Sequence, residues 1–375
     1  MNTKALLLSA YDARSHSLWR QRVVSLSPQI KWQQLVLPPR NFNWRIRSNS
    51  LHWASNNKDD LCADYDFLLA TSMVDLSSLR GLVPPLSKLP TIVYFHENQF
   101  AYPDQQPEEK DKRPANIEPL LVPIYSALCA DKIVFNTNFN KATFIQGAEK
   151  FFNRLPDKLP EVVIKKLESA EVIPVPVEIL TAKTTSTERS TTLEVLWNHR
   201  WEYDKGPELL LAIIERATRQ NLPIRFHIVG EKFRQQPTAF AQIDQLLREH
   251  EENLSIEKGS YGFIDSEQQY YNLLGSCDVV LSTAMHDFQG LAIQEACLAG
   301  CTPLAPDNLA YPEYLASNFL YHNELADTDK VNFVVQRLQE LQDLKQNNRE
   351  LPKVDLTGFT AEVLEATYTE LFSFY

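Results

Sequence analysis

Two cationic side chains spaced to bind an anion, Arg200 and Lys205, follow an apolar run in the segment LWNHRWEYDKGPELL. A guanidinium offers a planar fork of donors and an ammonium offers a point charge, and both suit phosphate oxygens. Pro207 opens a helical pattern, and the free N–H groups of a helix start also favour an anion. The segment therefore predicts a diphosphate site. The alternative is a surface turn in which both cations pair with neighbouring acids, Glu202 and Asp204.

An acid pair follows in the segment HDFQGLAIQEACLAGCTP. Asp287 precedes Gly290 in a short polar loop, and Glu295 lies about a turn and a half inside the helix expected to begin there. Such carboxylates can accept hydrogen bonds from vicinal hydroxyls, and the bare Gly290 lets backbone N–H groups approach a phosphate or a sugar. The alternative is an ordinary N-terminal acid and a surface glutamate.

Strands and helices must position these residues, and short apolar runs recur with helical patterns between them. This spacing is typical of βαβ units and predicts an α/β fold with parallel sheets. Strands are expected at residues 5–8, 32–37, 67–70, 91–95, 132–135 and 172–177, and then at 193–197, 224–229, 254–256, 279–281 and 302–304.

The chain is predicted to form two domains, because the Ser- and Thr-rich stretch TAKTTSTERSTT reads as a solvated linker. We expect a Rossmann-like domain over 1–180, the linker over 181–192, a second Rossmann-like domain over 193–350, and a C-terminal helix over 351–375 that packs on the body. Ligands of such sheets bind beyond the carboxyl ends of the strands, so two facing domains would make a cleft.

Composition narrows the functional classes. A formal net charge of -11 argues against a protein that coats nucleic acid non-specifically. The five cysteines include no CxxC pair, so we expect buried free thiols rather than disulfides or a zinc site. The first apolar run turns polar by residue 11, as in a first strand rather than a signal peptide. No membrane span is predicted, and the expected compartment is a reduced cytoplasm.

Polar residues follow the strands of the first half and would line the same cleft. His96-Glu97-Asn98-Gln99 comes directly after the strand at 91–95, and a histidine there can adopt either protonation state near a reacting hydroxyl. A lone histidine is otherwise structural. Three residues follow the first strand in the same way: Tyr11, Ser15 and His16. Two asparagines follow a later strand and could equally be turn formers or helix caps: Asn136 and Asn138.

Aromatic residues and arginines alternate over residues 40–47, RNFNWRIR. RNA loops are recognised through bases stacked on aromatic or guanidinium planes, with cations on the backbone. The stretch is the best candidate for RNA contact, through Arg40, Trp44, Arg45 and Arg47. The alternative is an amphipathic helix with Trp44, Ile46 and Leu51 partly in the core.

The pattern HRW-x4-KGP after a strand, followed by D-x7-E on a helix, resembles the retaining nucleotide-sugar glycosyltransferases of family 4. The resemblance implies the GT-B architecture and a donor site in which Arg200 and Lys205 bind the diphosphate and Glu295 binds the ribose. It places Asp287 near the transferred sugar, although the family's usual residue there is a glutamate. The implied donor site also includes His199, Gly290, Leu291 and Tyr261, the last near the expected base region with Gly230 to Phe233.

The segments LSAYDARSHSLWR, LPPRNFNWRIRSN, YFHENQFAYP and FNTNFN resemble the tRNA-queuosine mannosyltransferase family, with Asp12-Ala13 where animal members usually carry Gly-Gly. The resemblance implies transfer of mannose from GDP-mannose to queuosine in a tRNA anticodon, with retention of configuration. The implied catalytic residues are His96, Glu97 and Asp287. The implied acceptor-binding residues are Tyr11, His16, Arg40, Trp44, Arg45, Arg47, Asn98 and Gln99.

No metal or other cofactor is expected, because Arg200, Lys205 and a helix terminus can stabilise the leaving diphosphate electrostatically. Two DxD tripeptides, residues 64–66 and 327–329, are interpreted as surface acids. Beyond the nucleotide-sugar and tRNA, no membrane or protein partner is predicted. Two alternatives stay open: a family 4 enzyme with a glycan or small-molecule acceptor, and a catalytically silent nucleotide-sugar or RNA-binding module.

Overall fold

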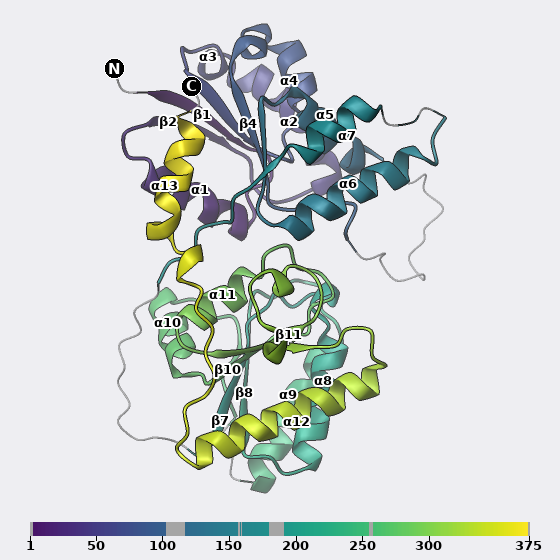
Figure 1. Ribbon diagram of the computed structural model, residues 1–375, viewed down its shortest axis with the longest axis vertical. Helices are drawn as coiled ribbons and strands as arrows, with labels where there is room; N and C mark the ends of the chain where they lie inside the picture. Colours follow the sequence, from purple (N-terminus) through teal and green to yellow (C-terminus); the bar gives the residue numbers. More distant parts are fainter. Residues whose placement is uncertain are drawn as a thin grey trace. The chain divides into compact units, whose positions relative to one another are not determined.

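The computed structural model describes residues 3–102, 117–156, 158, 160–179, 191–254 and 258–373. The chain forms two compact units, one comprising Met1–Pro176 with Ala361–Tyr375 and the other comprising Val177–Thr360 (Figure 1). Most of the predicted linker, residues 181–190, lies outside the described residues. Each unit is an α/β fold around a parallel sheet.

The first sheet has the strand order β2-β1-β3-β4-β5-β6. Its strands are β1 (Lys4–Ser9), β2 (Lys31–Val36), β3 (Phe67–Thr71), β4 (Thr91–Phe95), β5 (Lys132–Phe135) and β6 (Glu171–Val172). The predicted strand at 172–177 is wrong beyond its first residue, because prolines at 174 and 176 have no N–H to donate to a ladder. The order reverses direction between β1 and β3, which is where such sheets bind ligands.

Helices cover both faces of this sheet. Tyr94 of β4 stacks on Trp19 of α1, whereas its neighbour Phe95 packs on Phe135 and Phe144, because successive side chains of a strand point to opposite faces. The helices are α1 (Arg14–Leu26), α2 (Phe42–Asn56), α3 (Lys58–Leu61), α4 (Leu76–Leu82), α5 (Glu118–Cys129), α6 (Asn138–Phe152) and α7 (Glu161–Glu168).

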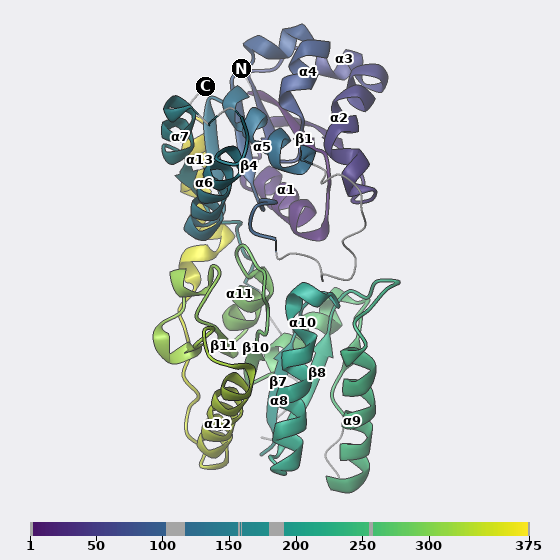
Figure 2. The same ribbon diagram turned by 90° about the vertical axis from the view of Figure 1, so that its right-hand side faces the viewer.

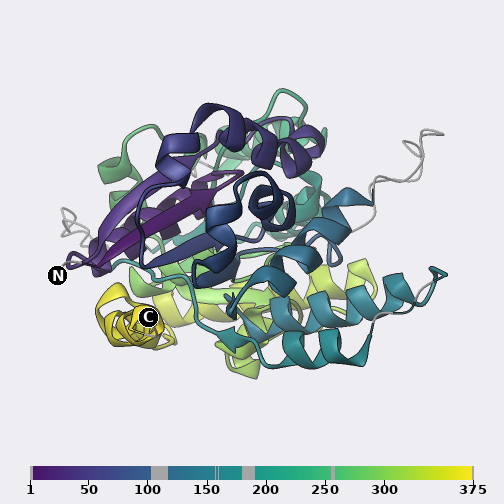
Figure 3. The same ribbon diagram turned by 90° about the horizontal axis from the view of Figure 1, so that it is seen from above.

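The C-terminal helix α13 (Ala361–Phe372) belongs to the first unit, beside α1. Figures 1 and 3 show it in yellow near the purple start of the chain. The Trp19 indole donates to the hydroxyl of Tyr368 at 3.0 Å, and that hydroxyl donates to the Pro174 carbonyl at 3.0 Å. The predicted segment 351–375 is therefore divided, since residues up to Thr360 group with the second unit.

The second sheet has the order β12-β11-β10-β7-β8-β9. Its strands are β7 (Leu193–Trp197), β8 (Ile224–Val229), β9 (Tyr261–Gly262), β10 (Val279–Leu281), β11 (Thr302–Pro306) and β12 (Leu320–Tyr321). The strand predicted to begin at Leu254 is wrong there, because Leu254 ends helix α9 (Ala239–Leu254), whose Phe240, Ile243 and Leu247 recur at helical spacing. Residues 255–257 lie outside the described part of the chain.

Two helical layers sandwich the second sheet. Leu193, Val195 and Trp197 of β7 face α8 (Pro207–Arg219), α9 and α12 (Asp327–Gln346), and Figure 2 shows α8 between the other two. Leu196 faces the layer containing α10 (Glu267–Ser276) and α11 (Leu291–Leu298). The strand order reverses between β7 and β10, so the residues that follow these two strands occupy the expected ligand position of the sheet.

The structure confirms the expectation for the DxD tripeptides and confirms the expectation for the cysteines only in part. All five cysteines are free, but only Cys277, Cys297 and Cys301 are buried, and the prediction is wrong for Cys62, which is exposed. The aspartates of both tripeptides are exposed, as predicted. Asp327 and Asp329 lie in the first turn of α12. No helix among the described residues is long and apolar enough to cross a bilayer.

Candidate active site

The anion-binding candidates lie directly beyond β7. A short 3-10 turn, Tyr203–Lys205, and a left-handed Gly206 lead into α8, and Lys205 is buried. Its ammonium donates to the carbonyl of His286 at 2.5 Å and lies 3.7 Å from the Asp287 carboxylate. The loop after β10 therefore meets the loop after β7 at Lys205.

Asp204 lies close to both cations. The sequence analysis considered it only as a competing surface acid. Its carboxylate lies 3.5 Å from the Lys205 ammonium and 3.7 Å from the Arg200 guanidinium. Burial opposes its charge, but His286, whose Nδ1 lies 3.8 Å away, and both cations keep the pKa of Asp204 well below its usual range. Asp204 is therefore a buried anion that positions Lys205.

Arg200 is 46% exposed and lies 2.7 Å from the carboxylate of Glu202. These contacts match the alternative considered above, in which both cations pair with the acids of their own turn. The two cations nevertheless lie at the edge of the sheet where ligands are expected, because Arg200 and Lys205 both follow the end of β7.

Gly206 makes the turn possible. Its φ is +64°, and an added Cβ would lie 2.1 Å from the carbonyl oxygen of Thr283. We expect Gly206→Ala to lower the free energy of unfolding by about 2 kcal/mol, from left-handed strain and the backbone clash. Denaturant unfolding measures this loss. Gly358→Ala is the matched control in the same unit, since its added Cβ meets nothing within 4 Å. Equal losses in the two variants would contradict the assignment.

Asp287 is held on both oxygens. Oδ1 accepts the N–H of Gly290 at 3.0 Å, and Oδ2 accepts the hydroxyl of Tyr311 at 3.2 Å. Burial would raise the pKa of Asp287, but Lys205, His199 and His286 outweigh it and keep that pKa below its usual value. The carboxylate is ionised at neutral pH and fixed in orientation.

His199 is buried directly beyond β7, and its Nε2 lies 3.1 Å from the Ser282 hydroxyl. Burial lowers the pKa of His199 to about 4, with Lys205 adding to the effect. The imidazole is therefore neutral at physiological pH. Ser282 in turn lies 2.8 Å from the hydroxyl of Tyr311. Sequence reasoning found neither Ser282 nor Tyr311, since no motif or spacing distinguishes them.

Gly290 caps α11 with a φ of +76°. An added Cβ would lie 2.6 Å from the hydroxyl of Tyr314 and 2.7 Å from the ring of Tyr311. Leu291 and Glu295 are half-buried on α11, and Asn198, beyond β7, donates to the carbonyl of Ala292 on that helix. The start of α11 is thus tied to the same edge as the cations.

Tyr261 lies further along the same sheet. Its hydroxyl donates to the carbonyl of Phe240, and its ring packs on Trp201 at a centroid distance of 4.9 Å. The ammonium of Lys232 lies 4.5 Å from the Trp201 ring centre, and that of Lys258 lies 4.6 Å from the Tyr261 ring centre. The expected base region therefore contains buried Trp201 and half-buried Tyr261, with a lysine ammonium against each ring.

In the first unit, His16 and His96 meet edge to face at 4.2 Å, both buried. The Nδ1 of His16 donates to the carbonyl of Tyr11 at 2.8 Å, while both ring nitrogens of His96 lack a hydrogen-bond partner among the described residues. Burial, with His16 adding, holds the pKa of His96 well below its usual value. His96 is therefore neutral, and the pair lies beyond β1 and β4. Tyr11 itself packs its ring on Phe42.

The neighbours of His96 have structural contacts. Glu97 accepts the hydroxyl of Tyr102 at 2.9 Å, and Gln99 is half-buried. Asn98 is buried and donates to the side chain of Asn140, while its own oxygen accepts two N–H groups of its loop. Asn136 donates to the carbonyl of His96, and Asn138 is the first residue of α6, where Thr137 is the cap. Asn98 and Asn136 therefore hold the loop that carries His96.

The arginine and aromatic stretch enters α2, with Arg40 and Asn41 before the helix and residues 42–47 in its first half. Trp44 is 67% exposed, and Leu51 is 58% exposed, so the amphipathic interpretation is wrong for these two and right for buried Ile46. Arg40 is exposed and Arg45 is half-buried. The guanidinium of Arg47 donates to buried Asp75 at 2.8 Å. The free aromatic face belongs to Trp44.

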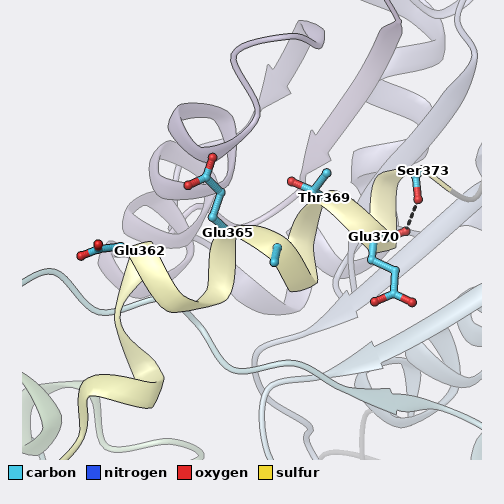
Figure 4. A pocket seen from close by; sticks show the side chains of 6 residues that line it. Glu362, Glu365, Thr369, Glu370 and Ser373 are labelled. Atoms are coloured by element: carbon cyan, nitrogen blue, oxygen red, sulfur yellow. Dashed lines mark hydrogen bonds between the residues drawn. The ribbon is translucent and has the colours of Figure 1, made fainter.

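One groove on the first unit lies apart from the predicted site residues. A shallow acidic groove on α13 is lined by Glu362, Glu365, Ala366, Thr369, Glu370 and Ser373, and includes none of the predicted site residues (Figure 4). Across the described ranges, no three His, Cys, Asp or Glu side chains are grouped to hold a metal ion.

Each half of the chain matches a family of known proteins. Residues 4–177 match the family model described as tRNA-queuosine alpha-mannosyltransferase N-terminal, and residues 181–352 match glycosyl transferases group 1. A Drosophila melanogaster tRNA-queuosine alpha-mannosyltransferase is 30% identical over 347 residues, covering 90% of this chain and 88% of that protein.

Solved structures agree on the fold. Anabaena HepE in complex with UDP is 14% identical with a TM-score of 0.63, and each chain is fully covered. The N-terminal domain of Candida albicans trehalose-6-phosphate phosphatase is 11% identical with a TM-score of 0.67, covering 100% of this chain and 97% of that one. The fold is α/β of the GT-B class, and the protein is a glycosyltransferase. With matches spanning both units, the chain belongs to the tRNA-queuosine alpha-mannosyltransferase family.

Proposed function

We propose that the enzyme acts in the cytoplasm and transfers mannose from GDP-mannose to queuosine in a tRNA anticodon loop, with retention of configuration and without a metal ion. The family match supports the acceptor and the sugar. The observation that carries the donor site is the position of Lys205, which is buried where the strand order of the second sheet reverses.

The second unit offers the groups that a sugar diphosphate needs. Lys205 and Arg200 supply positive charge for the leaving diphosphate, and the start of α11 supplies free N–H groups. Glu295 on the same helix is the proposed partner of the ribose. Asp287, held rigidly by Gly290 and Tyr311, is the proposed partner of the transferred sugar. Fixed charges of this kind stabilise a leaving diphosphate without a bound metal.

The first unit offers groups suited to the acceptor. Neutral His96 can accept a hydrogen bond from a hydroxyl, because its ring nitrogens have no partner within the described residues. We assign Tyr11, His16, Glu97 and Gln99 to its surroundings and Asn98 to the support of its loop. Exposed Trp44 presents a ring on which an unstacked base can lie, flanked by Arg40, Arg45 and Arg47.

The direct test incubates the chain with GDP-mannose and tRNA carrying queuosine, in the presence of EDTA, and analyses the digested nucleosides by mass. We expect mannosylated queuosine. Product only after a metal is added would contradict the metal-free donor site. A product with UDP-glucose but not GDP-mannose would contradict the donor, and donor hydrolysis without tRNA product would favour another acceptor.

Trp44→Ala tests the tRNA surface. We expect KM for tRNA to rise about tenfold with kcat unchanged, because stacking of one base on an aromatic ring is worth about 1 to 3 kcal/mol. Val162→Ala, at a residue 73% exposed on α7 of the same unit, is the control. An unchanged KM for Trp44→Ala would exclude this face of α2 as the contact.

A further inference from the structure

A chain of three hydrogen bonds connects the two loops that meet at the ligand edge of the second sheet. It runs from His199 Nε2 to Ser282 Oγ at 3.1 Å, from Ser282 Oγ to the Tyr311 hydroxyl at 2.8 Å, and from that hydroxyl to Asp287 Oδ2 at 3.2 Å. His199 follows β7, Ser282 follows β10, and Tyr311 opens a 3-10 turn beyond β11. His199, Ser282 and Tyr311 are buried.

Asp287 determines the direction of every bond in this chain. An ionised carboxylate can only accept, so the hydroxyl proton of Tyr311 points to Asp287. The hydroxyl of Ser282 then donates to the phenol oxygen. Ser282 has no second proton, so it must accept from His199, whose Nε2 therefore carries the hydrogen. The reverse direction would bring the bare phenol oxygen against a carboxylate.

The neutral imidazole of His199 then has one remaining group, an unprotonated Nδ1 that can only accept. We propose that Ser282 and Tyr311 are positioning residues that orient Asp287 and hold His199 in its Nε2–H tautomer, so that Nδ1 accepts a hydrogen bond from a hydroxyl of the transferred sugar. The role of the sugar hydroxyl rests on the proposed function. The tautomer rests on the hydrogen-bond chain alone.

Tyr311 also fixes the orientation of the Asp287 carboxylate before a sugar binds. A flexible acid would lose orientation each time a sugar left the site, whereas Asp287 is held by a backbone N–H on one oxygen and by the phenol on the other. The carboxylate therefore meets the donor already oriented, which is how an enzyme avoids paying for reorganisation during the reaction.

Tyr311→Phe is the test, read by long-range proton–nitrogen NMR of the chain labelled with ¹⁵N-histidine, with His199→Gln used to assign the signal. We expect Nε2–H in the parent chain. In the variant, the freed Ser282 hydroxyl donates to Nε2, so the Nδ1–H form becomes populated. We expect kcat to fall about tenfold, while the affinity for GDP, which lacks the sugar, changes less than about twofold.

Tyr321→Phe is the matched control. Its hydroxyl is also buried and donates to Ser282, but to the main-chain carbonyl at 3.0 Å, outside the chain. It should leave the tautomer and kcat unchanged. An Nδ1–H form in the parent chain, an unchanged tautomer in Tyr311→Phe, or equal losses of kcat in both variants would overturn the proposal.

Adding GDP-mannose, but not GDP, to the parent chain should shift the ¹⁵N resonance of His199 Nδ1 as that atom accepts a hydrogen bond. Equal shifts with both ligands would overturn the sugar contact. A parent chain that shows the Nε2–H form but transfers no mannose to tRNA would overturn the proposed function while supporting the hydrogen-bond chain.

Discussion

Lys205→Met is expected to lower kcat/KM for sugar transfer by at least about a hundredfold and the free energy of unfolding of the second unit by about 3 kcal/mol. The ammonium is buried between Asp204 and Asp287, so its removal leaves Asp287 without its counterion and leaves Asp204 with only half-exposed Arg200. The leaving diphosphate also loses a fixed positive charge. Steady-state kinetics and denaturant unfolding measure the two effects.

The two effects can be separated by a second substitution. Lys205→Met combined with Asp204→Asn removes one of the uncompensated charges, so stability should recover in part while transfer stays low. Lys345→Met is the matched control, because Lys345 pairs with Asp278 in the same unit without touching the candidate site. It should lose stability and keep activity. Normal transfer by Lys205→Met would remove the buried cation from the mechanism.

Arg200→Ala is expected to lower kcat/KM at least tenfold, mainly through KM for the donor, since each charge-assisted bond to a diphosphate is worth about 1.5 to 3 kcal/mol. Stability should change by less than about 0.5 kcal/mol, because both side chains of the pair with Glu202 are partly exposed to solvent. The opposite distribution, stability lost and transfer intact, would identify Arg200 as a purely structural partner of its own turn.

Arg219→Ala is the matched control for Arg200. This arginine is exposed on α8 of the same unit and pairs with Glu215 at 2.9 Å. It should change neither transfer nor stability. The Glu202→Gln variant adds a further check, because removal of the competing carboxylate should lower KM for the donor if Arg200 binds the diphosphate.

The sequence by itself determined the alternation of strands and helices, because burial of parallel strands requires continuous apolar runs that are visible along the chain. Nine of those strands could be placed within a few residues of their positions. It also determined which polar residues follow β1, β4, β7 and β10, and thus where ligands of the two sheets would bind. The short strands β9 and β12, of two residues each, have no such run and were missed.

Only the tertiary structure decided how those polar residues are connected. His199 and Ser282 are separated by 83 positions and Trp19 and Tyr368 by 349, so no local pattern indicates either hydrogen bond. Asp204 looked like a competing surface acid until burial beside Lys205 made it a positioning group. A side chain's pKa and tautomer depend on neighbours brought together by folding, and sequence order does not contain those distances.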